Sequence, residues 1–137
     1  HKTLAYLDRW LLAQRAVAAG ADDALLLGEH GAMLETTRAG VLWLVHGRWR
    51  AAPNDGQILP SIAVAVLEQA LAQAGVRVER RAVGVGELNS VTGAVCVNSV
   101  RGALRVAAIG DHALPPAAVD DDVDHLVRRF TACFAVV

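Results

Sequence analysis

The chain contains a single lysine, Lys2, against twelve arginines. A lysine amine can add to an aldehyde and form a Schiff base, whereas the guanidinium group of arginine stays protonated and delocalised and cannot do so. A chain that uses arginine for its other positive charges therefore keeps its one lysine either as a solvated charge near a terminus or for chemistry that needs an amine.

The other reactive side chains do not form a recognisable set by spacing alone. The histidines lack metal-ligand spacing, so no metal site is predicted, and we interpret them as surface or turn residues: His30, His46, His112 and His125. The two cysteines, Cys96 and Cys133, lie in apolar segments. This context favours reduced core cysteines over a disulfide or a metal pair, and with them a cytoplasmic location.

The composition fits one soluble domain. The 137 residues suffice for a hydrophobic core, and no apolar run is long enough for a membrane span or shaped like a signal peptide. The net charge of −1, without a basic stripe, disfavours binding to nucleic acid or to an anionic membrane. Because the chain opens with His1 and Lys2 instead of Met, we expect it to begin partway through a longer protein.

The elements that would position these residues follow from hydrophobic periodicity. Apolar spacing predicts helices, with Thr3 as a first N-cap and Gly20 as a stop, while short apolar or alternating runs predict strands. The expected fold is mixed α/β (α+β), strand-rich in the middle, with a strand hairpin at His46-Gly47. The expected helices span 3–19 and 60–75, with a third opening at 120–122; the expected strands span 24–27 (buried), 32–36, 41–45, 48–50, 76–80 (edge), 94–97 (buried) and 104–109.

Four segments, in order, resemble the class IV (fold-type IV) pyridoxal-phosphate enzymes, and more specifically their C-terminal half. KTLAYL at 2–7 is similar to the family pattern K-x-L-N-x-L. GADDALLL at 20–27, followed by the segment 34–42, is similar to G-x-D-E-A-L-L and the later E-x-x-x-x-N-L-F. ILPSI at 58–62 is similar to I-L-P-G-I-T-R, and NSVRG at 98–102 is similar to the lyase-like N-S-L-R-G. The matches cover most of residues 2–106.

The resemblance implies a bound pyridoxal 5′-phosphate and a role for each matching residue. Lys2 would hold the cofactor as a Schiff base, and Glu35 would keep the pyridine nitrogen protonated by charge pairing. The phosphate would be bound by backbone amides where the central helix begins, because a helix N-terminus attracts anions, and by a hydroxyl in the later turn. These positions are Ser61, Ile62, Ala63 and Ser99.

The sequence also departs from the family pattern. Ala63 replaces the phosphate-binding Thr, and a lost hydrogen bond to a charged group costs about 1.5–3 kcal/mol, or roughly 10- to 150-fold in affinity. The remaining departures are Ala5 and Gly40 for Asn, Ser61 for Gly, Val64 for Arg and Arg105 for Pro.

The predicted function is that of a lyase that converts 4-amino-4-deoxychorismate to 4-aminobenzoate and pyruvate. The alternatives are a class IV aminotransferase acting on branched-chain or D-amino acids, and a degenerate homologue without activity. The resemblance implies a homodimer and a missing N-terminal half, so that residues 1–137 form a single C-terminal domain that is inactive alone.

Overall fold

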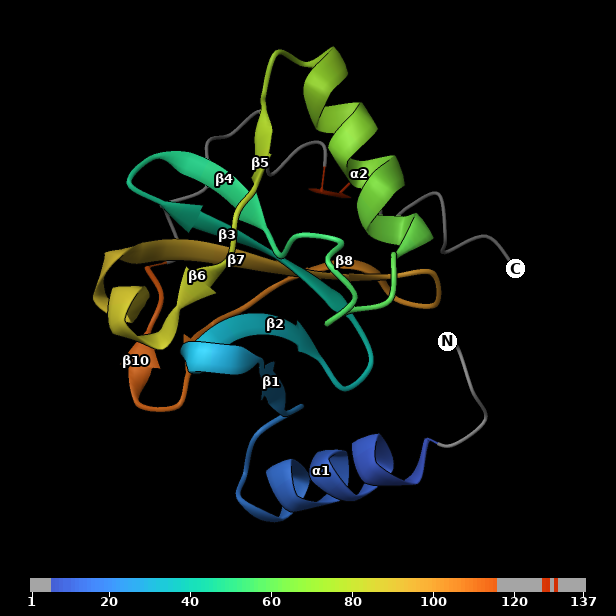
Figure 1. Ribbon diagram of the computed structural model, residues 1–137, viewed down its shortest axis with the longest axis vertical. Coiled ribbons are helices and arrows are strands. Elements are labelled where there is room, and N and C mark those ends of the chain that lie inside the picture. The colour runs from blue at the N-terminus through green and yellow to red at the C-terminus, as the bar shows by residue number, and fades with distance from the viewer. Residues whose placement is uncertain (1–5, 116–126, 129, 131–137) are drawn as a thin grey trace.

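A computed structural model describes residues 6–115 together with Val127, Arg128 and Phe130. Two helices, a twisted and mostly antiparallel eight-stranded sheet and a small two-stranded sheet form residues 6–115, which confirms the mixed α/β prediction (Figure 1). Lys2, His125, Cys133 and the helix start predicted at 120–122 lie outside the described residues.

The elements follow one another in the order below. The helices are α1 (Leu7–Ala18) and α2 (Ile62–Gln73), and two 3₁₀ turns span Glu29–Gly31 and Val85–Ser90. The strands are β1 (Leu25–Leu27), β2 (Ala32–Thr36), β3 (Gly40–Val45), β4 (Arg48–Ala51), β5 (Val78–Arg80), β6 (Val83–Gly84), β7 (Val91–Asn98), β8 (Gly102–Arg105), β9 (Ala108–Ile109) and β10 (His112–Ala113).

Strand β3 lies at the centre of the sheet. It pairs antiparallel with β4 along one edge and with β7 along the other, and β7 pairs with β8. The predicted hairpin between β3 and β4 is confirmed, since His46 and Gly47 have φ angles of +49° and +72°, as a tight two-residue hairpin turn requires. Strand β5 pairs parallel with β4 at the end of the strand order, which confirms the predicted edge.

The sheet is buried on both faces, and β3 shows why. Its even-numbered side chains, Leu42 and Leu44, face a cluster that includes Leu67 and Leu71 of α2. Its odd-numbered side chains face a second cluster on the other side: Val41, Trp43 and Val45 with Met33, Val83, Val91, Ala94 and Leu114. A strand covered on both faces reads as a continuous apolar run, which is the pattern of residues 41–45.

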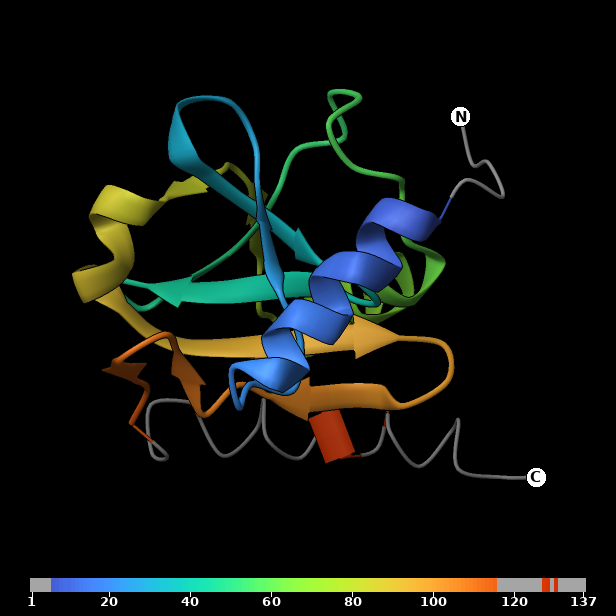
Figure 2. The ribbon, with the colours of Figure 1, turned by 90° about the horizontal axis from the view of Figure 1, so that it is seen from below.

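Helix α1 stands beside the sheet and packs only lightly against it (Figures 1 and 2). Within α1 the structure buries Ala13, whereas Leu7, Trp10 and Val17 are exposed. The helix ends as predicted, at a Gly20 with φ of +84°, and α1 begins at Leu7 with Tyr6 as its N-cap, whereas Thr3, the predicted N-cap, lies outside the described residues. The backbone of Tyr6 is not helical, and its hydroxyl donates a hydrogen bond to the carbonyl of Thr37.

Two strand predictions need correction. Strand β1 is not buried, because it is the last strand in the order and the side chain of Leu27 is 54% exposed. The single strand expected over 104–109 is two strands, because β8 ends at Arg105 and β9 then pairs with β10. In the described part of the chain, neither helix has the length and apolar character needed to cross a membrane.

Candidate active site

Glu35 is a buried carboxylate near the end of β2. The residue is 8% exposed and lies opposite Gly40 in the β2–β3 pairing. Its Oε1 accepts a hydrogen bond from Nη2 of Arg9 at 2.5 Å, and a second nitrogen of Arg9 lies 3.4 Å from the carbonyl oxygen of Thr36. A buried charge needs such a partner, because transferring an unpaired charge from water into the protein interior costs several kcal/mol.

The turn that joins β2 to β3 is stabilised by contacts with the side chain of Asp23. The Asp23 carboxylate accepts hydrogen bonds from the hydroxyl of Thr37 and from the amide of Ala24, and it pairs with Arg38 at 3.4 Å. Burial opposes the charge of Asp23, but the hydrogen bonds from Thr37, Thr36 and Ala24 and the charge of Arg38 outweigh it, so the pKa of Asp23 is lowered. This network fixes the turn between Glu35 and Gly40.

Helix α2 begins with an amide group free to bind an anion. Ser61 is its N-cap, and the Ser61 hydroxyl accepts a hydrogen bond from the amide of Val64 at 3.2 Å. No hydrogen bond is recorded from the amides of Ile62 and Ala63 to any described residue. The first turn also carries no acidic side chain, although acids are favoured there. Both features suit an anion at this helix end.

A small hollow joins Glu35 to the start of α2. Its volume is about 10 Å³, and it is lined by residues from β2, β3, the end of β4, the segment leading into α2, the first turn of α2 and the end of β5, among them Glu35, Gly40, Ser61 and Val64. Two predicted site residues that are 26 positions apart in the sequence, Glu35 and Ser61, therefore meet at one place.

Gly40 and Val64, which both depart from the family pattern, share one space in this hollow. A Cβ atom on Gly40 would lie 2.5 Å from Cγ2 of Val64, far inside contact distance, and 3.7 Å from Cβ of Ser61. The valine side chain occupies the volume that a side chain at position 40 would need. The two departures are therefore complementary, which single positions in the sequence could not indicate.

Ser99 lies in the turn between β7 and β8, and the structure places this turn beside the β2–β3 turn. Oδ1 of Asn98 accepts hydrogen bonds from the amides of Val100 and Arg101 at 3.0 and 2.7 Å, and its Nδ2 lies 3.4 Å from the carbonyl oxygen of Arg38. Ser99 itself is exposed and does not line the hollow.

Comparison with known proteins decides the family. A family model for amino-transferase class IV matches residues 1–109. The chain belongs to this family. Comparison with curated protein sequences gives no significant match.

Solved structures of class IV proteins share the fold. A Legionella pneumophila protein assigned as a 4-amino-4-deoxychorismate lyase is 23% identical with a TM-score of 0.84, over 93% of this chain and 47% of that one. A fold IV transaminase from Curtobacterium pusillum is 26% identical with a TM-score of 0.83, over 97% and 43%. A hypothetical aminotransferase from Mycobacterium tuberculosis, solved with pyridoxal phosphate bound, is 24% identical with a TM-score of 0.85, over 96% and 47%. The chain thus spans less than half the length of these relatives.

The structure also places at the site three residues to which the sequence analysis gave no role. Arg9, the partner of Glu35, lies on α1, and Asp23 and Tyr6 both hold the β2–β3 turn. No periodicity connects a helix arginine to a strand glutamate 26 residues later, but Asp23 followed by a strand is a typical signal of a local hydrogen-bonding role. Lys2 lies outside the described residues.

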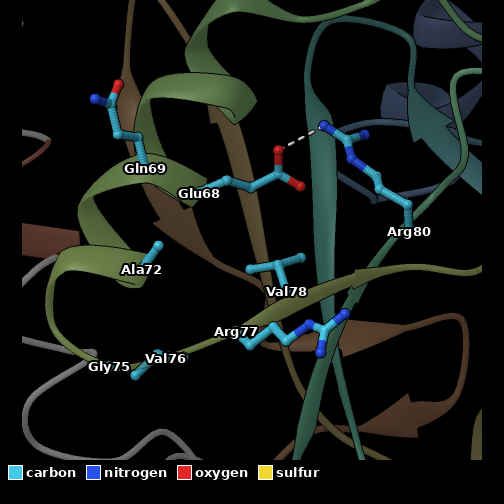
Figure 3. A pocket seen from close by; sticks show the side chains of 8 residues that line it. All are labelled: Glu68, Gln69, Ala72, Gly75, Val76, Arg77, Val78 and Arg80. Carbon is cyan, nitrogen blue, oxygen red and sulfur yellow. Dashed lines mark hydrogen bonds and ion pairs between the residues drawn. The ribbon is translucent and has the colours of Figure 1, made fainter.

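A second, larger cavity of about 430 Å³ lies between α2 and β5, away from the predicted residues (Figure 3). Glu68 and Arg80 face each other across it in an ion pair of 2.6 Å. None of the predicted site residues lines this cavity. Among the residues that the structure describes, no group of histidine, cysteine and acidic side chains has the arrangement of a metal site.

Proposed function

We propose that this class IV protein is a pyridoxal-phosphate-dependent lyase that converts 4-amino-4-deoxychorismate to 4-aminobenzoate and pyruvate. The observation that carries the cofactor assignment is the hollow that joins Glu35 to the start of α2. The proposal includes a cytoplasmic location, which agrees with Cys96 being a free thiol.

The residues present fit the cofactor. A pyridoxal phosphate carries an anionic phosphate and a basic ring nitrogen; Glu35 in the hollow offers a partner for the nitrogen, and the first turn of α2 beside the hollow offers one for the phosphate. The amides of Ile62 and Ala63 suit the phosphate, and the buried carboxylate of Glu35 suits a protonated ring nitrogen. Ser99, on the turn beside the β2–β3 turn, would add a hydroxyl to the phosphate site.

Each residue then has a distinct task. When bound, the cofactor supplies a ring that accepts the electron pair released as a proton leaves the substrate carbon bearing the amine. Glu35 holds a proton on the ring nitrogen. Lys2 would hold the cofactor through its amine, and the same amine would move the proton at the substrate carbon. Ile62 and Ala63 fix the phosphate end, and so orient the ring.

The turn at residues 98–102 favours a lyase over an aminotransferase, because its sequence NSVRG is similar to the lyase-like pattern. The side chain of Asn98 holds this turn together by accepting hydrogen bonds from the amides of Val100 and Arg101. An aminotransferase is the second candidate, and the 26% identity to the Curtobacterium pusillum transaminase favours it. A homologue without activity is the third, suggested by Gly40, Ala63 and Val64.

We further propose that an N-terminal half completes the site in the full-length protein, and that the active form is a homodimer. The span of the chain, 43–47% of the three relatives described above, supports a missing half. Residues 1–137 alone should then lack one wall of the substrate pocket and be inactive.

The test combines cofactor trapping with turnover. Full-length protein incubated with pyridoxal phosphate and then borohydride should carry a phosphopyridoxyl group on Lys2 in a peptide map. Lys2→Arg is the matched control, because it keeps the charge but cannot form the bond. Labelling elsewhere, or none, would refute the cofactor site. Aminodeoxychorismate supplied without a keto acid should then yield pyruvate and 4-aminobenzoate, whereas turnover that requires 2-oxoglutarate and an amino-acid donor would assign an aminotransferase.

A further inference from the structure

We propose that Arg9 is a positioning residue, which fixes the carboxylate of Glu35 so that one oxygen faces the cofactor ring. The inference rests on the proposed function and adds to it a residue from α1, an element that contributes nothing to the lining of the hollow.

The guanidinium group of Arg9 contacts two acceptors on neighbouring residues. Nη2 donates to Oε1 of Glu35 at 2.5 Å, and Nη1 donates to the carbonyl oxygen of Thr36 at 3.4 Å. The planar fork therefore binds a side chain and the backbone of β2 at once, which a single ammonium cannot do in the same geometry. This arrangement restricts rotation of the Glu35 carboxylate.

The second oxygen of Glu35, Oε2, has no recorded hydrogen bond to a described residue, while Glu35 lines the hollow. Among the described residues, Arg9 is the one recorded hydrogen-bond partner of this carboxylate, through Oε1. Glu35 lines the hollow, and its side chain is only 10% exposed. Oε2 is thus the atom available to a donor in the hollow, and the ring nitrogen of the proposed cofactor is such a donor.

The ion pair between Arg9 and Glu35 adds little to the stability of the folded protein. Ion pairs withdrawn from water lose much of their attraction to desolvation, so an apolar pair often serves stability as well. Helix α1 buries Ala13 and leaves Trp10 and Leu11 exposed, so it adds little packing for the pair to reinforce. Orienting Glu35 explains why an arginine occupies this position.

The experiment compares Arg9→Gln and Arg9→Lys with Arg48→Gln in full-length protein. Arg48 forms an exposed pair with Glu79 at 3.5 Å and is the matched control, because it lies on β4 away from the hollow. The readouts are cofactor affinity by absorbance titration, the pH midpoint of the bound-cofactor spectrum, and the melting temperature.

We expect Arg9→Gln to weaken cofactor binding by about 10-fold or more, as for a lost hydrogen bond to a charged group, and to move the spectral pH midpoint. Arg9→Lys should recover part of both changes, and Arg48→Gln should change neither. If Arg9→Gln or Arg9→Lys lowers only the melting temperature and leaves affinity and midpoint at the wild-type values, Arg9 is merely structural and the inference is overturned. Wild-type protein that takes up no cofactor on Lys2 overturns the proposed function and this inference together.

Discussion

Replacing Gly40 by alanine should test whether Val64 fills the space beside it. A Cβ at position 40 would lie 2.5 Å from Cγ2 of Val64. Val64 is 4% exposed, and a valine in a helix has one strongly preferred rotamer, so its methyl group cannot swing aside cheaply. The added carbon must therefore move either β3 or the first turn of α2.

The magnitude follows from two opposing terms. Overpacking a well-filled core costs about 1–3 kcal/mol, whereas removing a glycine from a strand returns about 0.5–1 kcal/mol. The difference between the two terms is about 0–2.5 kcal/mol, so Gly40→Ala should destabilise the wild-type protein by about 1 kcal/mol. In a Val64→Ala background the clash is absent, and the same substitution should stabilise by about 0.5–1 kcal/mol. The sign of the effect thus depends on residue 64.

Urea unfolding of the four proteins in this double-mutant cycle measures the coupling, which should be about 1–3 kcal/mol. Gly86→Ala is the matched control, because a Cβ at that glycine meets no atom within 4 Å. If Gly40→Ala costs the same in both backgrounds, or no more than Gly86→Ala, the complementarity of Gly40 and Val64 is refuted.

Three further predictions concern the surroundings of the site. Ser61→Ala removes the cap on the Val64 amide and should cost about 0.5–2 kcal/mol in urea unfolding, whereas Ser61→Gly should cost less. Because the pKa of Asp23 is lowered from its ordinary 3.8, its stabilising charge is complete above that value and is lost as the pH falls through the folded-state pKa. Asp23→Asn should therefore be less stable at neutral pH and lose less stability on acidification; equal acid sensitivity would contradict this. Burial raises the pKa of Cys96 to about 11, so its thiol should resist alkylation near pH 8 until the protein unfolds, as peptide mapping would show.

Local sequence patterns predicted the elements that hold the site. The apolar run 41–45, the His46-Gly47 turn and the helix after Pro60 all appear where expected, because each is specified by a few neighbouring residues. The resemblance to class IV enzymes pointed to Glu35 and Ser61, and the structure brings both to one hollow. The role of Lys2 stays a prediction.

Contacts between distant segments could not be predicted in this way. The hydroxyl of Tyr6 bonds the carbonyl of Thr37, 31 positions away, and Arg9 pairs with Glu35, 26 positions away. Periodicity says which side chains share a face, but it does not say which residues that face will meet. The exposure of β1 has the same cause, since a run of leucines predicts burial only if another element covers it.

The distribution of the departures from the family pattern bears on whether the protein is an enzyme. Ala63 and Val64 replace side chains at the start of α2, but an amide donor belongs to the backbone and survives any substitution except proline. The Val64 side chain fills the space beside Gly40, so these two departures compensate each other in packing and remove no backbone amide from the site. In the proposed site, Lys2 and Glu35 would perform the two tasks that no backbone group can perform, forming a covalent bond through an amine and pairing with a ring nitrogen, and both positions resemble the family pattern. A protein drifting away from catalysis has no reason to lose replaceable groups and keep the irreplaceable ones, so this pattern favours an active enzyme.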